Sequence, residues 1–169
     1  CLAVEKLLQL EVPARAQWTR VMLTELTRIN SHLVWLGTHA LDIGAMTVFH
    51  NPFRERELIL DLFEEYCGAR LTYNSMRIGG LPLDVPVGWD RKVLEFCKIM
   101  SEKVDEYEEL LTHNRIWLER TKGIGVITAE EAIAIGLSGP PLRGSGVTRD
   151  IRKDEPYAAY AEMTFDVPS

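Results

Sequence analysis

Long apolar runs are missing from this sequence of 169 residues. A helix that crosses a bilayer needs about 20 consecutive, mostly apolar residues, and no segment here approaches that length. We therefore predict no transmembrane segment. Hydrophobic residues make up 46% of the chain and charged residues 26%, which is the ordinary balance of a globular protein. If the protein works at a membrane, another component must hold it there.

Cysteine is scarce, and the cysteines present are not paired in the sequence. Cys1, Cys67 and Cys97 are far apart, and no Cys-x-x-Cys motif occurs. This spacing suits neither a disulfide framework nor an iron–sulfur or zinc site. The four histidines show no metal-ligand spacing, and the Glu-x-x-His pair of a di-iron bundle is absent. We predict that the chain holds no metal.

An excess of positive charge is also absent, because the net charge is −6. Nucleic-acid binding requires a basic surface, so we expect no nucleic-acid partner. The sequence contains no serine-centred nucleophile elbow. The segment Arg143-Gly-Ser-Gly146 resembles a phosphate-binding loop, but it lacks the preceding strand and the full glycine pattern. We interpret it as a flexible turn.

Helical periodicity is what the sequence does contain. Apolar residues recur at steps of three and four along residues 14–47, as expected for a helix packed in a bundle. Thr128 and Glu131 form the capping-box pattern of a further helix start. The apolar stripe of the long helix is Met22, Leu26, Ile29, Leu33, Leu36, Ala40 and Ile43. In the two helices that follow, the residues expected inside include Leu58, Leu62, Phe63, Val93, Phe96 and Val104.

The predicted fold is mainly α: a helical bundle with a loop-rich C-terminal part, forming a single helical domain over residues 1–169 that is a fragment of a longer subunit. Loops as long as the connection over residues 71–88 tend to be functional. The helices are expected at about 1–10, 14–47, 52–67, 90–112, 115–120 and 129–135, with residues 136–169 irregular.

A second stripe, of ionisable residues, follows the same long helix. It consists of Glu25, Arg28, His32, His39 and Asp42, whose spacing places them on one face. Two interpretations stay open: a solvated face, or a face that handles protons. Trp35 lies within the stripe, and the residues next to Asp42 are apolar or small. These neighbours predict a partly buried carboxylate, whose pKa burial would raise unless a cation compensates.

Four alternating charges, Arg54, Glu55, Arg56 and Glu57, begin the third predicted helix. Residues two apart lie on opposite sides of a helix, so we expect at least one Arg–Glu pair to face inward. A buried pair is seldom selected for stability alone. The alternative is a capped and solvated first turn.

Several segments together resemble one family, the 49 kDa (D-type) subunit of NADH–quinone oxidoreductase, respiratory complex I. They occur in the family's order, essentially from end to end of the chain. They include Leu2-Ala-Val-Glu-Lys-Leu-Leu8, Glu25-Leu-Thr-Arg-Ile29, Leu36-Gly-Thr-His-Ala-Leu-Asp-Ile-Gly-Ala45, Phe53-Arg-Glu-Arg-Glu57, Arg77-Ile-Gly-Gly80, Leu142-Arg-Gly-Ser-Gly146, Asp150-Ile-Arg-Lys153 and Thr164-Phe-Asp-Val-Pro168.

The resemblance implies a fold like the core of the nickel–iron hydrogenase large subunit, with the metal-binding cysteines lost. It implies a peripheral place at the cytoplasmic face of the bacterial inner membrane. The expected partners are quinone, the subunit that holds the terminal [4Fe–4S] cluster, and the membrane subunit of the quinone channel. NADH, FMN and iron–sulfur clusters belong to the whole complex, and this fragment is expected to bind no cofactor and to be inactive by itself.

Five residues take family roles by resemblance. Asp42 matches the acid that couples protons or charge to the quinone headgroup site, and Thr38 and Val34 match residues of the quinone pathway. Arg77 matches an arginine near the terminal cluster. Thr72 stands where many members have a histidine, and threonine cannot take up a proton in that pH range. Two alternatives are a hydrogenase-type large subunit and an inert helical scaffold.

Overall fold

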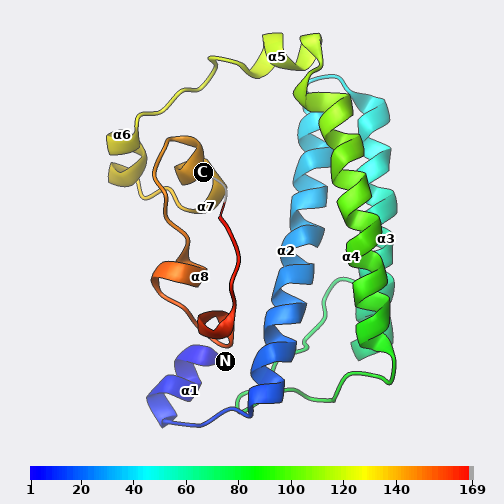
Figure 1. Ribbon diagram of the computed structural model, residues 1–169, viewed down its shortest axis with the longest axis vertical. Coiled ribbons are helices and arrows are strands. Elements are labelled where there is room, and N and C mark those ends of the chain that lie inside the picture. The colour runs from blue at the N-terminus through cyan, green and yellow to red at the C-terminus, as the bar shows by residue number, and fades with distance from the viewer. Residues whose placement is uncertain (168–169) are drawn as a thin grey trace. The chain divides into compact units, whose positions relative to one another are not determined.

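The computed structural model describes residues 1–167, which are mainly helical and contain no strand (Figure 1). The prediction of a mainly α fold is thereby confirmed. Contacts group the chain into two compact units, Cys1–Arg120 and a second that begins at Thr121. The single domain and the likeness to hydrogenase stay predictions. No described helix is both long and apolar enough to cross a membrane.

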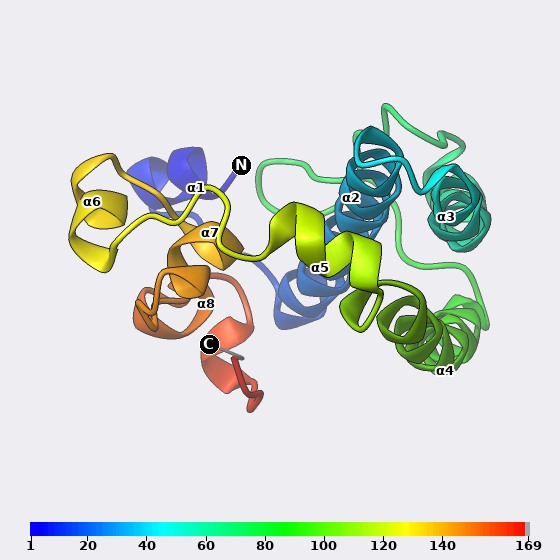
Figure 2. The ribbon, with the colours of Figure 1, turned by 90° about the horizontal axis from the view of Figure 1, so that it is seen from above.

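The first unit is built on three long helices that run side by side (Figures 1 and 2). These are α2 (Ala14–Asp42), α3 (Met46–Cys67) and α4 (Trp89–Tyr107). The short helix α1 (Leu2–Leu8) precedes them. A π-helical turn (Glu108–Thr112) and α5 (Arg115–Thr121) follow α4.

The core of this unit lies where the three helices meet. Trp89 is completely buried, and its indole nitrogen donates to the carbonyl of Leu62 at 2.9 Å, so its one polar atom is satisfied. The apolar stripe predicted for the long helix is buried or half-buried throughout, and its members from Met22 to Leu36 pack in this core, whereas Ala40 packs in a separate small cluster. The buried cluster contains Leu23, Leu26, Leu33, Ile59, Leu62, Phe63, Tyr66, Trp89, Val93, Phe96, Met100 and Tyr107.

Two residues predicted to lie inside are exposed: Leu58 is 39% exposed and Val104 is 46% exposed. Each lies one residue away from the better-covered face of its helix. Periodicity identifies which face of a helix is apolar, but neighbouring helices cover only part of that face. The margin of an apolar face therefore stays in contact with solvent.

The break between the second and third helices lies about five residues earlier in the chain than residues 47–52, where it was predicted. The long helix ends at Asp42 and α3 begins at Met46, so Pro52 lies inside α3 and does not start it. The turn depends on Gly44, whose φ of 93° is in the left-handed region that favours glycine. A helix was expected from residue 52 because proline fits best in the first turn of a helix.

The second unit contains four short helical segments: α6 (Ala129–Ala134), α7 (Gly139–Gly144), α8 (Ile151–Asp154) and a 3₁₀ turn (Tyr160–Glu162). The predicted capping box of α6 is confirmed. The prediction that residues 136–169 are irregular is wrong for α7, α8 and the 3₁₀ turn. The prolines after Gly139 fit the first turn of α7, and Asp150 caps α8. Pro168 and Ser169, the end of that predicted segment, lie outside the described residues.

Candidate functional site

The acid singled out by the sequence, Asp42, is the last residue of α2 and is exposed. The prediction that it is partly buried is wrong for this chain. Its apolar neighbours Ala40 and Ile43 point to other sides, and Ala40 is completely buried. Elsewhere in the ionisable stripe, Glu25 and Arg28 form an ion pair at 3.2 Å. Of the five stripe residues, His32 and Asp42 are exposed, whereas Glu25, Arg28 and His39 are half-buried.

The two residues matched to the quinone pathway lie one and two turns before Asp42. Val34 is half-buried and Thr38 is exposed. The hydroxyl of Thr38 donates to the carbonyl oxygens of Val34 and Trp35, at 2.9 and 3.1 Å. Its proton is thus held by the helix backbone, while the oxygen keeps its capacity to accept.

Three aromatic rings pack together at the last turns of α2. The ring of His39 stacks on Trp35, with centroids 5.7 Å apart, and meets the edge of Trp117 from α5 at 5.3 Å. The Nη1 atom of Arg120, one turn further along α5, donates to the carbonyl of Ile43. Figure 2 shows α5 over this end of α2. Sequence reasoning missed the two α5 residues, because no local pattern links positions 77 residues apart.

The charged run at 54–57 splits between the interior and the surface. The carboxylate of Glu55 is buried and accepts from Arg54 at 2.7 Å, although the side chain of Arg54 is 56% exposed. Glu57 pairs outside the run, with Arg70. The guanidinium of Arg56 lies 5.9 Å from the centroid of the Phe53 ring. Of the Arg–Glu pair that was expected to face inward, only the acid is buried. Its arginine reaches solvent.

A second buried group completes the surroundings of Glu55. The hydroxyl of Tyr107 donates to the other oxygen of Glu55 at 2.5 Å. Burial, together with the nearby carboxylate, raises the pKa of Tyr107. Tyr107 is therefore a neutral donor near pH 7, and it ties the end of α4 to α3.

A buried ion pair fixes the long loop between α3 and α4, and sequence reasoning missed it. Arg20 donates to both oxygens of Glu5, at 2.9 and 2.7 Å, and both side chains are at least 95% buried. Arg20 also donates to the carbonyls of Arg77 and Gly80, at 2.7 and 2.9 Å. The amide of Gly79 donates to Glu5 at 2.8 Å. Helices α1 and α2 and the loop are therefore joined through one guanidinium.

The electrostatics of this network favour its ionised form. The hydrogen bond from Arg20 lowers the pKa of Glu5 to about 2, against the opposing effect of burial. A bidentate pair in which each guanidinium nitrogen donates to an acceptor is the geometry in which a buried charge is tolerated. The network contacts the loop through its backbone groups. The side chains of the loop take no part in it.

The two loop residues matched to the cluster region, Thr72 and Arg77, are both exposed. The guanidinium of Arg77 donates to the carbonyl of Asn74 at 2.7 Å, so its position is fixed by its own loop. Next to it, Leu23, Thr24 and Thr27 of α2 and loop residues 73–76 line an open groove of about 310 Å³. The hydroxyl of Tyr73 donates to Thr27 across this groove at 2.8 Å.

Asp42 and Arg77 do not come together. The backbone of Arg77 is held at Arg20, near the start of α2, whereas Asp42 ends that helix. An α-helix advances about 1.5 Å per residue, so the stretch from Arg20 to Asp42 covers roughly 33 Å. The structure therefore separates the candidate residues into a loop site and a helix-end site.

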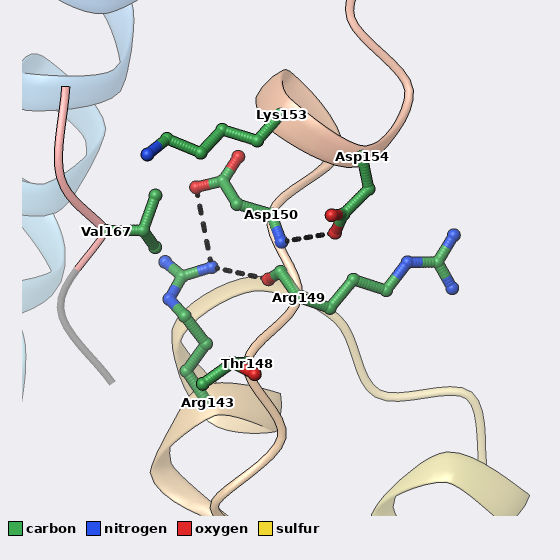
Figure 3. Close-up of a pocket in the computed structure, with 7 residues that line it drawn as sticks. All are labelled: Arg143, Thr148, Arg149, Asp150, Lys153, Asp154 and Val167. Atoms are coloured by element: carbon green, nitrogen blue, oxygen red, sulfur yellow. Dashed lines mark hydrogen bonds and ion pairs between the residues drawn. The ribbon is translucent and has the colours of Figure 1, made fainter. Parts of the chain in front are cut away.

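The segment interpreted as a flexible turn has a defined structure in the second unit (Figure 3). Arg143 lies in the last turn of α7, and its Nη1 donates to the carbonyl of Arg149 at 3.1 Å and lies 3.7 Å from Asp150. The hydrogen bond from Arg152 lowers the pKa of Asp150 to about 2. Arg143 and Asp150 border a pocket of about 140 Å³. Because the acid and the cations already satisfy one another, the arrangement is an internal ion cluster.

A metal centre has no ready set of ligands in the part of the chain that the structure describes. No three His, Cys, Asp or Glu side chains of residues 1–167 gather as a metal ion would need. The described cysteines form no disulfide, and Cys67 is the one that is half-buried.

Comparisons with known proteins match this chain along its length. A family described as "Respiratory-chain NADH dehydrogenase, 49 Kd subunit" matches residues 42–169. A D-type subunit of the NADH-quinone oxidoreductase of Solibacter usitatus is 59% identical over 169 residues, which is 100% of this chain and 41% of that protein. Its counterpart in Campylobacter concisus is 58% identical over 168 residues, or 99% of this chain and 41% of that protein. The chain thus spans about two fifths of the length of these relatives.

The ion pair at Arg20 generates a testable prediction. Replacing Glu5 by Gln leaves a buried guanidinium without its counter-charge, which typically costs about 3–5 kcal/mol of stability. We expect Glu5→Gln to lower the free energy of unfolding in urea at pH 7 and to speed hydrogen exchange at the amides of Gly79 and Gly80. The control is Asp84→Asn, which breaks the exposed Arg15–Asp84 pair and should change neither quantity measurably.

The same pair fixes the sign of a pH dependence. The folded-state pKa of Glu5 is about 2 and its ordinary value is 4.5. Its contribution to stability is therefore fully present above pH 4.5 and is lost as the pH falls to about 2. The difference between wild type and Glu5→Gln should shrink over that interval. Equal stability of the two proteins at pH 7 would contradict the assigned role of the pair.

Proposed function

This chain belongs to the family of the 49 kDa subunit of respiratory-chain NADH dehydrogenase, and from that premise we propose that it is part of the quinone-site subunit of the proton-pumping NADH:quinone oxidoreductase. The observation that carries the proposal is the 59% identity over all 169 residues, a span that contains the segment Leu36–Ala45 with Asp42. The activity belongs to the assembled complex, of which this chain supplies one structural part.

The end of α2 is proposed as a wall of the quinone chamber. When bound, quinone accepts two electrons and two protons. Asp42 would relay protons or charge there, with Val34 and Thr38 along the path to it. Large apolar side chains lie exposed beside the acid, with Trp35 at 58% and Met46 at 65%. Large apolar side chains that gather on one exposed surface are typical of a face that another segment or chain covers. Such a cover would desolvate Asp42 and raise its pKa.

The loop site is proposed to face the terminal [4Fe–4S] cluster of a partner subunit. This chain offers no set of cysteine ligands, so its contribution would be the fixed positive charge of Arg77. A cation close to an iron–sulfur cluster favours the reduced form and raises the reduction potential. The buried pair of Glu5 and Arg20 would hold that charge in place, because it anchors the loop backbone on both sides of Ile78.

The surroundings of the chain follow from the same proposal. Its partners would be the other complex I subunits, especially the subunit of the terminal cluster and the membrane subunit of the quinone channel. The complex as a whole uses NADH, FMN, iron–sulfur clusters and quinone. The chain would sit peripherally at the cytoplasmic face of the bacterial inner membrane.

A second candidate function is that of an inert helical scaffold. One observation favours it: Thr38 and Asp42 are both exposed on this chain. The two functions differ in a single respect, which is whether the carboxylate of Asp42 takes part in quinone reduction. A substitution that removes only its charge separates them.

We expect Asp42→Asn to assemble into the intact complex and to lose quinone reductase activity by about a hundredfold, the scale on which a positioned proton-transfer group contributes. NADH oxidation by ferricyanide, which does not require quinone, should be unchanged. Asp105→Asn, a charge removal on the exposed side of α4, is the matched control and should be fully active. Wild-type quinone reduction by Asp42→Asn would refute the role and support the scaffold.

Thr72 generates a prediction about the partner's cluster. Because threonine does not titrate near neutral pH, we expect no contribution from this position to the pH dependence of the cluster's midpoint potential. Thr72→His should add a dependence that approaches roughly 59 mV per pH unit around the pKa of the histidine. Redox titration of the intact complex at pH 6–8 measures it. A Thr72→His complex whose potential follows pH as the wild type does would place Thr72 away from the cluster.

A further inference from the structure

We propose that α5 is a positioning clamp for the turn that carries Asp42, and that Trp117 and Arg120 are its two contact residues. The inference rests on the proposed function of Asp42 and adds to it two residues outside α2. Neither residue needs to touch quinone. They would act by holding the end of α2 in one place.

Arg120 forms a hydrogen bond to the turn directly after Asp42. Helices end with carbonyl groups that have no partner within the helix. At the end of α2, the amides of Ile43, Gly44 and Ala45 donate to the carbonyls of His39, Leu41 and Ala40, at 3.3, 2.9 and 2.8 Å. Arg120 adds a donor to the carbonyl of Ile43 itself. A cation at this end of a helix is also favoured by the helix dipole.

Trp117 contacts α2 on the N-terminal side of Asp42. It lies one turn ahead of Arg120 on α5, so both side chains leave the same face of that helix. Its ring lies at 89° to the ring of His39, three residues before Asp42, with the centroids 5.3 Å apart. It also packs against the small buried cluster of Ala40, Val48 and Leu111. Contacts on both sides of Asp42 restrict rotation and translation of the turn.

The fit between α5 and the turn is close. A Cβ atom added at Gly44 would lie 3.0 Å from Nη1 of Arg120, and this glycine already needs its φ of 93° to make the turn. The backbone of the turn therefore passes close to the guanidinium, and a side chain at this position would push Arg120 away from its contact. A glycine here serves both the bend and the approach of Arg120.

The clamp is itself fixed to the bundle. The side-chain oxygen of Asn114 accepts from the amides of Ile116 and Trp117, at 2.9 and 3.2 Å, and so caps the start of α5. The preceding π-helical turn contributes Leu111 to the cluster under Trp117. π-Helical turns occur frequently at functional sites. Helix α5 is thus placed by α4, and α4 by the core.

The consequence for the reaction is a loss of rate when the clamp is opened. A displacement of about 1 Å at a reacting group can cost up to about a hundredfold in rate. A clamp that is partly opened should cost less, because the helix still holds Asp42 on one side. The effect should fall on kcat and not on the KM for quinone, because α5 positions a proton-handling group and binds no substrate.

The test uses the intact complex with Arg120→Gln and, separately, Trp117→Leu. The leucine keeps an apolar group on the cluster but loses the ring contact with His39. Each should lower kcat for quinone reduction about three- to tenfold, with KM within twofold of wild type and ferricyanide reduction unchanged. Trp117→Phe should restore most of the rate. Arg115→Gln is the matched control, because Arg115 is on the same helix, is 89% exposed and pairs with Glu119.

A double substitution identifies the route of the effect. If Arg120 acts through Asp42, adding Arg120→Gln to Asp42→Asn should cause no further loss. If the double variant loses activity by the product of the two single losses, the clamp is overturned. A wild-type kcat in both Arg120→Gln and Trp117→Leu also overturns it. Should Arg120→Gln not assemble, Trp117→Leu alone carries the test. A fully active Asp42→Asn complex refutes the role of Asp42, whereas an inactive one beside wild-type clamp variants refutes the clamp alone.

Discussion

The arrangement of the first unit depends on one buried guanidinium. Arg20 meets the carboxylate of Glu5 on one side and two loop carbonyls on the other, so it joins α1, α2 and the loop before α4. Such a pair contributes less net stability than apolar packing would, because removing both charges from water costs free energy. What it provides is a defined position for a loop that has little regular structure of its own. Arg77 lies in that loop, and the role proposed for its charge requires that its place be fixed.

Helix α2 then determines how far apart the two sites are. The loop is held near its start and the acid is at its end, with an apolar face packed on α3 between them. Helices in a well-packed bundle are stiff because their interiors have few voids. A stiff α2 with a site at either end keeps the charge of Arg77 and the acid of Asp42 at a constant separation, as the roles proposed for these two residues require.

Sequence reasoning succeeded where the physical cause was local. The apolar period of α2 predicted Leu26 and Leu33 in the core, and the capping box predicted the start of α6. It failed where the cause was distant. Neither the partners of Arg20 nor the contact of Arg120 with Ile43 leaves a local pattern, because the atoms that meet are far apart in the chain. The apolar neighbours of Asp42 suggested burial, but adjacent residues point in other directions and do not say what covers a helix end. The roles of Asp42 and Arg77 came from resemblance and not from the pattern.

The central claim is that the exposed end of α2 becomes a wall of the quinone chamber in the assembled enzyme. An experimental structure of the intact complex with bound quinone tests it most directly. We predict that Asp42 and Thr38 lose their contact with bulk water and border the quinone cavity, while Arg77 faces the terminal cluster of the neighbouring subunit. A structure in which Asp42 stays open to bulk water, with neither a cavity nor another segment beside it, would contradict the proposed role of this helix end and leave only the family relationship.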